Sequence, residues 1–124
     1  MERRHLDDPP VPGPPGSTES VLLGVSCTTA VACTAVGYYV RSGSGYLTLA
    51  EAWNGRSWQI QATPNPAGAL ATTLTGVSCT AARTCLAVGS HLTTAATSLT
   101  LAEAWDGTSW QIQAIPSPAG ATPE

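Results

Sequence analysis

The feature that most constrains this 124-residue chain is a long internal repeat. Residues 47–62 return almost unchanged as residues 99–114, an offset of 52 residues. Shorter motifs, such as Gly-Val-Ser-Cys and Ala-Val-Gly, recur at the same offset without a gap. We therefore divide the ordered chain into two equivalent units, residues 21–70 and residues 71–124.

Each copy of the long repeated segment predicts a β-hairpin. Asn54-Gly55 and Asp106-Gly107 are strong turn signals, because these residue types tolerate positive φ. Along residues 47–53, large side chains alternate with small, mostly apolar ones. Since neither face is strongly polar, we expect the sheet to be covered on both sides. A two-residue turn and a bulged three-residue turn both fit the Asn-Gly pair.

Turn signals divide each unit into four short strands, and no helix is predicted. The expected strands are residues 21–27, 33–40, 46–53 and 58–63, followed by 73–79, 85–92, 98–105 and 110–115. Four strands in a period near 50 residues are typical of a propeller blade. The predicted fold class is all-β, with two four-stranded antiparallel propeller-like blades.

The repeated motifs resemble those of known propeller repeats. An apolar strand, a Val-Gly strand and a strand–Asn/Asp-Gly–Trp hairpin resemble the kelch and galactose-oxidase-like type. The set Gly-Val-Ser-Cys, Cys-Thr-Ala-Val-Gly, Ala-Glu-Ala-Trp-Asn/Asp-Gly-x-Ser-Trp and Pro-x-Pro-Ala-Gly-Ala more closely resembles tandem repeats of uncharacterised actinobacterial secreted proteins. The resemblance covers residues 21–121. It implies a propeller-like fold and secretion, and it supplies no activity or catalytic residue.

Two blades do not close a propeller, which usually has about four to eight. Three interpretations therefore stay open. Several copies of the chain assemble into one ring, the chain is a piece of a longer protein, or the two sheets stack as a small sandwich. The first interpretation makes a second copy the expected partner, in a homo-oligomer that completes the ring.

The four cysteines form one C-x5-C pair in each unit. Cys27 and Cys33, like Cys79 and Cys85, flank a short loop between two expected strands, so each pair faces across one hairpin. We expect two disulfides, which indicate an oxidising, extracellular or cell-surface location. Reduced buried cysteines and a four-thiolate zinc site are the alternatives, although zinc spacings are usually shorter. We expect no metal and no cofactor.

The first 20 residues are charged and then proline-rich, which predicts a disordered tail. They contain PxxP patterns, so a docking motif is the alternative. They lack the apolar segment of a signal peptide, which leaves a cytoplasmic location open. Charged residues make up only 10% of the chain and the net charge is −3, so we expect no nucleic-acid partner. No apolar run is long enough to predict a membrane span.

No catalytic motif is found, so we expect a non-enzymatic protein. Glu51 and Glu103 occupy the same place on an otherwise apolar face. We expect them to accept hydrogen bonds from a backbone, Arg or Trp N–H group, and a pair of catalytic carboxylates is the alternative. The other residues assigned to the structural repeat are tryptophans beside the turns: Trp53, Trp58, Trp105 and Trp110.

The two units differ most where a binding surface is expected. Tyrosine and arginine are typical of such surfaces, and a rigid scaffold often displays function on its loops. The candidate ligand-binding residues are Tyr38, Tyr39, Arg41, Tyr46 and His91. The expected function is a binding or scaffolding module for a protein or glycan. A fragment of a propeller enzyme (hydrolase or oxidase) and a purely structural surface repeat are the alternatives.

Overall fold

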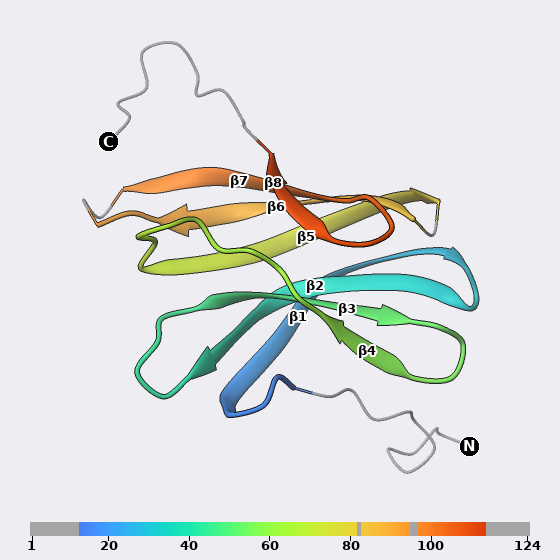
Figure 1. The fold of residues 1–124 in the computed structure, drawn as a ribbon, viewed down its shortest axis with the longest axis horizontal. Coiled ribbons are helices and arrows are strands. Elements are labelled where there is room, and N and C mark those ends of the chain that lie inside the picture. The colour runs from blue at the N-terminus through green and yellow to red at the C-terminus, as the bar shows by residue number, and fades with distance from the viewer. Residues whose placement is uncertain (1–12, 82, 95–96, 114–124) are drawn as a thin grey trace.

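The computed structural model describes residues 13–81, 83–94 and 97–113. These residues form eight β-strands and no helix (Figure 1). The strands are β1 (Ser17–Thr29), β2 (Ala32–Arg41), β3 (Leu47–Trp53), β4 (Trp58–Gln61), β5 (Ala71–Ala81), β6 (Thr84–Leu92), β7 (Ser98–Trp105) and β8 (Trp110–Gln113). The all-β prediction is confirmed.

The strands form two separate four-stranded antiparallel sheets, as predicted. The first sheet has the order β1-β2-β3-β4 and the second has the order β5-β6-β7-β8. Their registers correspond: Trp53 pairs with Trp58 in the first sheet, and Trp105 pairs with Trp110 in the second. The two sheets lie in two layers (Figure 1), and neither closes into a barrel.

A glycine in β2 and another in β6 allow each first strand to bulge. The register shifts between Leu22 and Gly24 in β1, where Leu22 pairs with Gly37. A Cβ at Gly37 would collide with the backbone of Val21, and Gly89 stands in the same relation to Thr73. The Val-Gly motif of each unit is therefore required by the close approach of two backbones.

Two of the predictions concern the ends of the chain, where the described residues begin and end. β1 begins at Ser17, inside the segment predicted as a tail, because Ser17 pairs with Arg41 at the end of β2. The PxxP pattern at Pro9 and the second Pro-x-Pro segment lie outside the described residues. The structure therefore extends the first strand by four residues relative to the predicted start at Val21.

Each sheet has two unlike faces, and the two sheets stack through one of each kind. We call the side that carries the tryptophans the tryptophan face and the opposite side the small-residue face. Val36 and Ala50, on the small-residue face of the first sheet, pack with Leu74, Ala87 and Trp110 on the tryptophan face of the second. This contact is the hydrophobic core, and it covers one side of each sheet.

Polar contacts and a close backbone approach fix how the sheets stack. The Cys79 amide donates to Ser26 Oγ at 3.0 Å, and Trp110 Nε1 donates to Gln61 Oε1 at 2.9 Å. β1 and β5 meet at their bulges, where a Cβ on Gly24 would lie only 3.0 Å from the Cα of Gly76. The geometry of stacking is therefore specified by hydrogen bonds as well as by apolar contact.

Candidate binding cleft

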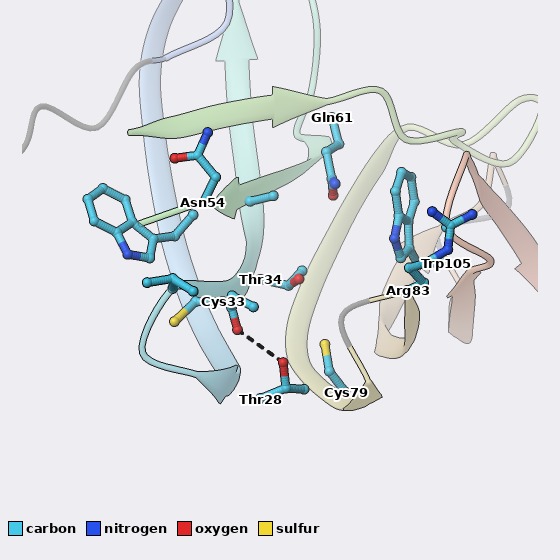
Figure 2. Close-up of a pocket in the computed structure, with 13 residues that line it drawn as sticks. Thr28, Cys33, Thr34, Asn54, Gln61, Cys79, Arg83 and Trp105 are labelled. Carbon is cyan, nitrogen blue, oxygen red and sulfur yellow. Dashed lines mark hydrogen bonds between the residues drawn. The ribbon is translucent and has the colours of Figure 1, made fainter. Parts of the chain in front are cut away.

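A cleft opens between the two sheets at one end of the stack. Its volume is about 270 Å³, and it lies where the β1–β2, β3–β4 and β5–β6 turns come together (Figure 2). Clefts of this kind between packed elements are common ligand sites. Its polar and aromatic side chains are Thr28, Thr34, Asn54, Gln61, Arg83, Trp53 and Trp105.

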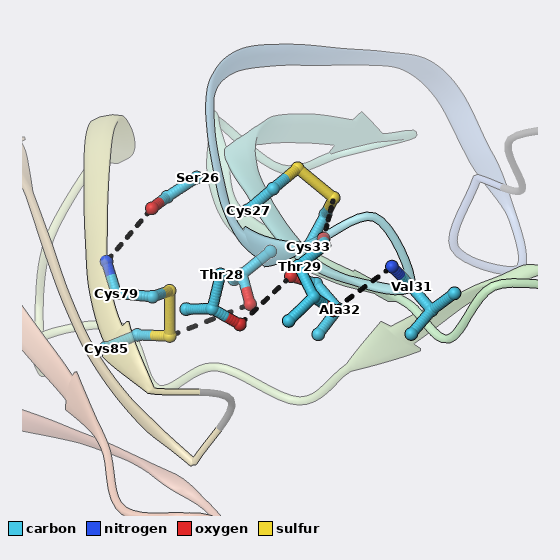
Figure 3. Close-up of a disulfide and its surroundings, with 10 residues drawn as sticks. Ser26, Cys27, Thr28, Thr29, Val31, Ala32, Cys33, Cys79 and Cys85 are labelled. Carbon is cyan, nitrogen blue, oxygen red and sulfur yellow. Dashed lines mark hydrogen bonds between the residues drawn. A yellow bond between two sulfur atoms is a disulfide. The ribbon is translucent and has the colours of Figure 1, made fainter.

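Two disulfides brace the hairpins that frame the cleft. Cys27 is bonded to Cys33 and Cys79 to Cys85, as predicted, and the described chain has no free cysteine (Figure 3). Cys33 and Cys79 line the cleft directly. The pairs are compatible with an oxidising, extracellular environment. Cross-linked hairpins hold the cleft walls in place before any ligand arrives, which lowers the ordering cost of binding.

The β3–β4 turn forms another wall of the cleft. Four residues separate the paired Trp53 and Trp58, and the Asn54 amide donates to the Ser57 carbonyl at 3.2 Å. The turn is longer than the two- or three-residue loop predicted from Asn-Gly. The Asn54 side chain explains it, since Oδ1 accepts hydrogen bonds from the amides of Arg56 and Ser57 and closes the turn locally.

The equivalent β7–β8 turn is closed by a carboxylate. Asp106 Oδ1 accepts from the amides of Thr108 and Ser109 and from the Thr108 hydroxyl. These hydrogen bonds, the Thr108 amide first, lower the pKa of Asp106 to about 2. Trp105 and Trp110 flank this turn with ring centroids 5.7 Å apart. The expected pairing of tryptophans beside each turn is therefore observed.

Two side chains at the cleft have hydrogen-bond donors without partners in the described part of the chain. The Arg83 guanidinium packs against the β7–β8 turn, where a Cβ on Gly107 would lie 2.8 Å from Nε. Within the described ranges, Arg83 forms no ion pair, and no carboxylate lines the cleft. Gln61 accepts from Trp110 through Oε1, so its NH₂ group stays available. The cleft therefore favours a ligand that is rich in acceptor oxygens.

The two glutamates of the repeat are buried away from the cleft. Glu51 is 1% exposed and Glu103 is fully buried, and burial raises the pKa of each to about 7. The hydrogen bonds expected for them are not found among the described residues. The ladder neighbours of Glu51 are Ala35 and Ile60, which offer no side-chain donor.

The structure does not bring the two carboxylates together. Glu103 points from the second sheet into the space between the layers, because it shares a face with Leu101 and Ala87 of the core. Glu51 points from the first sheet to the outside of the stack. The first sheet therefore lies between the two side chains, and the paired-carboxylate alternative has no geometric basis.

The tyrosine-rich candidates gather at the other end of the first sheet. Tyr38 stacks on Tyr46 with ring centroids 4.3 Å apart, and the Arg41 guanidinium lies 5.5 Å from the ring of Tyr39. Ser44 closes the turn by donating to the Arg41 carbonyl. These four aromatic and basic residues therefore contact one another in pairs, where β2 ends and β3 begins, and none of them lines the cleft.

His91 lies in the second sheet, near the same end. Its Nδ1 is buried without a hydrogen-bond partner in the described residues, beside a cavity of about 240 Å³. Its ladder partner Thr72 donates its amide to the Tyr46 carbonyl at 2.8 Å. This bond joins β5, which pairs with the strand of His91, to Tyr46 in the turn between β2 and β3.

Sequence reasoning missed Arg83 and Gln61. Arg83 occupies the position that Val31 holds in the first unit, and this difference between the units was the available signal. The second unit has a glutamine, Gln113, at the position of Gln61, so nothing in the sequence distinguishes Gln61 from its counterpart. Its role depends on how the sheets stack, which a repeat alone does not specify.

Comparisons of the chain with protein-family models, curated proteins and solved structures find no match. Across the described residues, no helix is long and apolar enough to cross a membrane. Function is therefore inferred from the geometry and chemistry of this chain itself.

Proposed function

We propose that the protein is a non-enzymatic binding module that holds an acidic glycan in the cleft between its two sheets. The observation that carries this proposal is the guanidinium of Arg83, which has no ion-pair partner among the described residues, beside a braced cleft whose described lining has no carboxylate. A guanidinium matches a carboxylate in both charge and shape, and a partly enclosed site strengthens that pairing.

The other groups of the cleft suit a sugar ring. The free NH₂ of Gln61 and the hydroxyl of Thr34 supply a donor and an acceptor for ring hydroxyls. The indole of Trp105 supplies an apolar wall for the C–H side of the ring. In Figure 2, Trp105 and Arg83 come from the second sheet, and Gln61 and Thr34 from the first. The ligand would therefore contact both sheets.

Binding without catalysis is favoured because the cleft lining, as far as the structure describes the chain, contains no carboxylate, histidine or free thiol. A hydrolase needs an acid and a base within reach of the ligand. The two carboxyls whose pKa is raised lie elsewhere in the stack. The enzyme-fragment alternative therefore receives no support from the site.

In the same proposal the two sheets are propeller-like blades, residues 21–70 and 71–124. Equal strand orders, corresponding registers and stacking through unlike faces support this assignment. The blades act as the rigid scaffold of the cleft. Tyr38 and Arg41 at the end of β2, together with Tyr46 across the β2–β3 turn, provide a second contact surface at the far end.

A glycan array, followed by calorimetry with a hexuronic-acid oligosaccharide and its neutral analogue, tests the proposal. Arg83→Val is the informative variant, because the first unit carries Val31 at this position. Arg56→Thr is the matched control, since Thr108 is its counterpart. We expect Arg83→Val to weaken binding at least about tenfold, the loss of one charge-assisted contact. Equal binding by Arg83→Val, or a preference for the neutral sugar, would contradict the proposal.

A further inference from the structure

We propose that the exposed small-residue face of the second sheet binds the exposed tryptophan face of the first sheet of another copy of this chain. The contacts would repeat those that join the two sheets within one chain. This inference goes beyond the binding cleft and does not depend on it, because the two outer faces lie on the opposite sides of the stack.

The outer faces carry a groove and the residue that fits it. Within the chain, Val36 is fully buried against the tryptophan face of the second sheet. Val88 holds the same register position in the second sheet and is 46% exposed. An apolar groove of about 330 Å³ lies on the outer tryptophan face of the first sheet, lined by Leu22, Val25, Ala35 and Trp58. Val88 of one copy would fill this groove in the next.

The groove residues are the same types in both sheets. Leu22, Val25, Ala35 and Trp58 correspond to Leu74, Val77, Ala87 and Trp110, which receive Val36 and Ala50 inside the chain. Val25 is 61% exposed, and Ile60 on the same face is 38% exposed. Exposed apolar side chains beside an apolar groove are typical of an association surface.

The polar contacts have counterparts as well. Trp110 donates to Gln61 within the chain, and Trp58 and Gln113 are the equivalent donor and acceptor on the two outer faces. Ser78 likewise corresponds to Ser26, which accepts from the Cys79 amide. Neither the groove nor the small-residue face of β6 and β7 has a charged side chain. Glu51, whose carboxyl lies on the same tryptophan face, is already only 1% exposed in the single chain, so joining the two faces buries no further charge.

One position differs between the two contacts in a way that suits assembly. Inside the chain, Thr34 Oγ1 lies 3.7 Å from Cys85 Sγ. The second sheet carries Leu86 in place of Thr34, and this leucine is 49% exposed. Against Cys33 of another copy, the leucine would replace a weak polar contact with an apolar one.

Gly24 and Gly76 distinguish the contact within one chain from the proposed contact between copies. A Cβ on Gly24 would lie 3.0 Å from both the Cα of Gly76 and the Thr75 carbonyl oxygen, so this position has no space within the chain. A Cβ on Gly76 would meet only Val88 Cγ2, at 3.8 Å. Within one chain there is therefore room for a Cβ at Gly76. In the proposed assembly, Gly76 would take the crowded position that Gly24 holds in the internal contact.

Joining unlike faces is a heterologous contact, which forms a ring when the rotation closes and an open stack when it does not. A symmetric dimer would instead join two like faces, either two tryptophan faces or two small-residue faces. The arrangement therefore predicts that blocking either face stops growth, and that two chains blocked on different faces still pair.

The experiment measures the mass of the full chain by analytical ultracentrifugation over roughly a hundredfold range of concentration. The chain should form species larger than a monomer. Gly76→Ala should keep the circular dichroism spectrum and weaken assembly at least about tenfold, whereas Thr108→Arg, a change in an exposed turn, should leave assembly unchanged. A monomer at every concentration would overturn the proposal, and so would assembly by Gly76→Ala at wild-type strength.

A mixing experiment then distinguishes the head-to-tail contact from other modes. Val25→Lys blocks the tryptophan face and Val88→Lys blocks the small-residue face, and both positions are exposed enough to keep the fold. Each variant alone should be monomeric, because every contact needs one face of each kind. Mixed together they should form a 1:1 dimer that does not grow. Self-association of either variant, or the absence of a mixed dimer, would overturn the proposed contact.

Discussion

The indole nitrogen of Trp110 donates a hydrogen bond to Oε1 of Gln61 across the space between the two sheets, at 2.9 Å. Trp110 is only 3% exposed, so water has little access to this nitrogen. The bond joins β8 of the second sheet to β4 of the first. Burying the N–H group without an acceptor costs more free energy than the hydrogen bond itself contributes. The contact therefore favours the stacking that places Gln61 opposite Trp110.

Removing that acceptor should destabilise the fold. We expect Gln61→Leu to lower the free energy of unfolding by about 1–3 kcal/mol, because the Trp110 N–H would be buried without a partner. Urea unfolding followed by tryptophan fluorescence measures the change. Gln59→Leu is the control, since Gln59 lies on the same strand and is exposed. Equal losses in both variants would show that the hydrogen bond does not stabilise the stack.

The buried glutamates should make the protein less stable as the pH rises. The pKa of each is about 7 in the folded state, against 4.5 for an ordinary glutamate. Between these values the unfolded chain releases protons that the folded chain retains. The free energy of unfolding should therefore be highest below about pH 4.5, fall as the pH rises and level off above pH 7. The total fall should be on the order of 3 kcal/mol for each residue.

Neutral variants check the origin of this pH dependence. Glu103→Gln keeps the shape of the side chain and cannot ionise, so it should be more stable than the wild type at pH 8 and similar at pH 4. Glu51→Gln should behave in the same way. Thermal unfolding at a series of pH values gives the comparison. If the stability of the variants depends on pH as steeply as that of the wild type, the two carboxyls are not the groups that titrate.

The repeat predicted much of the fold, and the stacking of the sheets explains what it missed. Asn54-Gly55 marked the hairpin, and period-two alternation predicted which residues share a face with Trp53. Alternation does not show what lies opposite a face, and the hydrogen bonds expected for Glu51 are not found among the described residues. The cleft escaped prediction because Arg83 and Gln61 come from different sheets, and no local pattern relates them.

The two disulfides should differ in their effect on stability. Each closes a short loop, which is worth about 2 kcal/mol by chain-entropy reasoning. Cys85 is 4% exposed and belongs to the core, whereas Cys27 lies on the outer face and is exposed. We therefore expect the Cys79→Ala/Cys85→Ala variant to lose more stability than Cys27→Ala/Cys33→Ala. Urea unfolding of both measures the difference, and equal losses would contradict the assigned core position.

The two hairpin turns differ at one residue, and that difference should appear only in acid. Asp106 has a pKa of about 2 because the amides of Thr108 and Ser109 and the Thr108 hydroxyl donate to its carboxylate. A depressed pKa means that its contribution is present above about pH 3.8 and is lost as the pH falls through 2. Asp106→Asn should abolish this dependence, because Asn54 already closes the first turn through the same two backbone contacts. The reverse change, Asn54→Asp, should add a second acid-sensitive turn. Nuclear magnetic resonance titration of the turn amides from pH 5 to pH 2 distinguishes the variants, and an ordinary aspartate titration near pH 4 at Asp106 would refute the turn geometry.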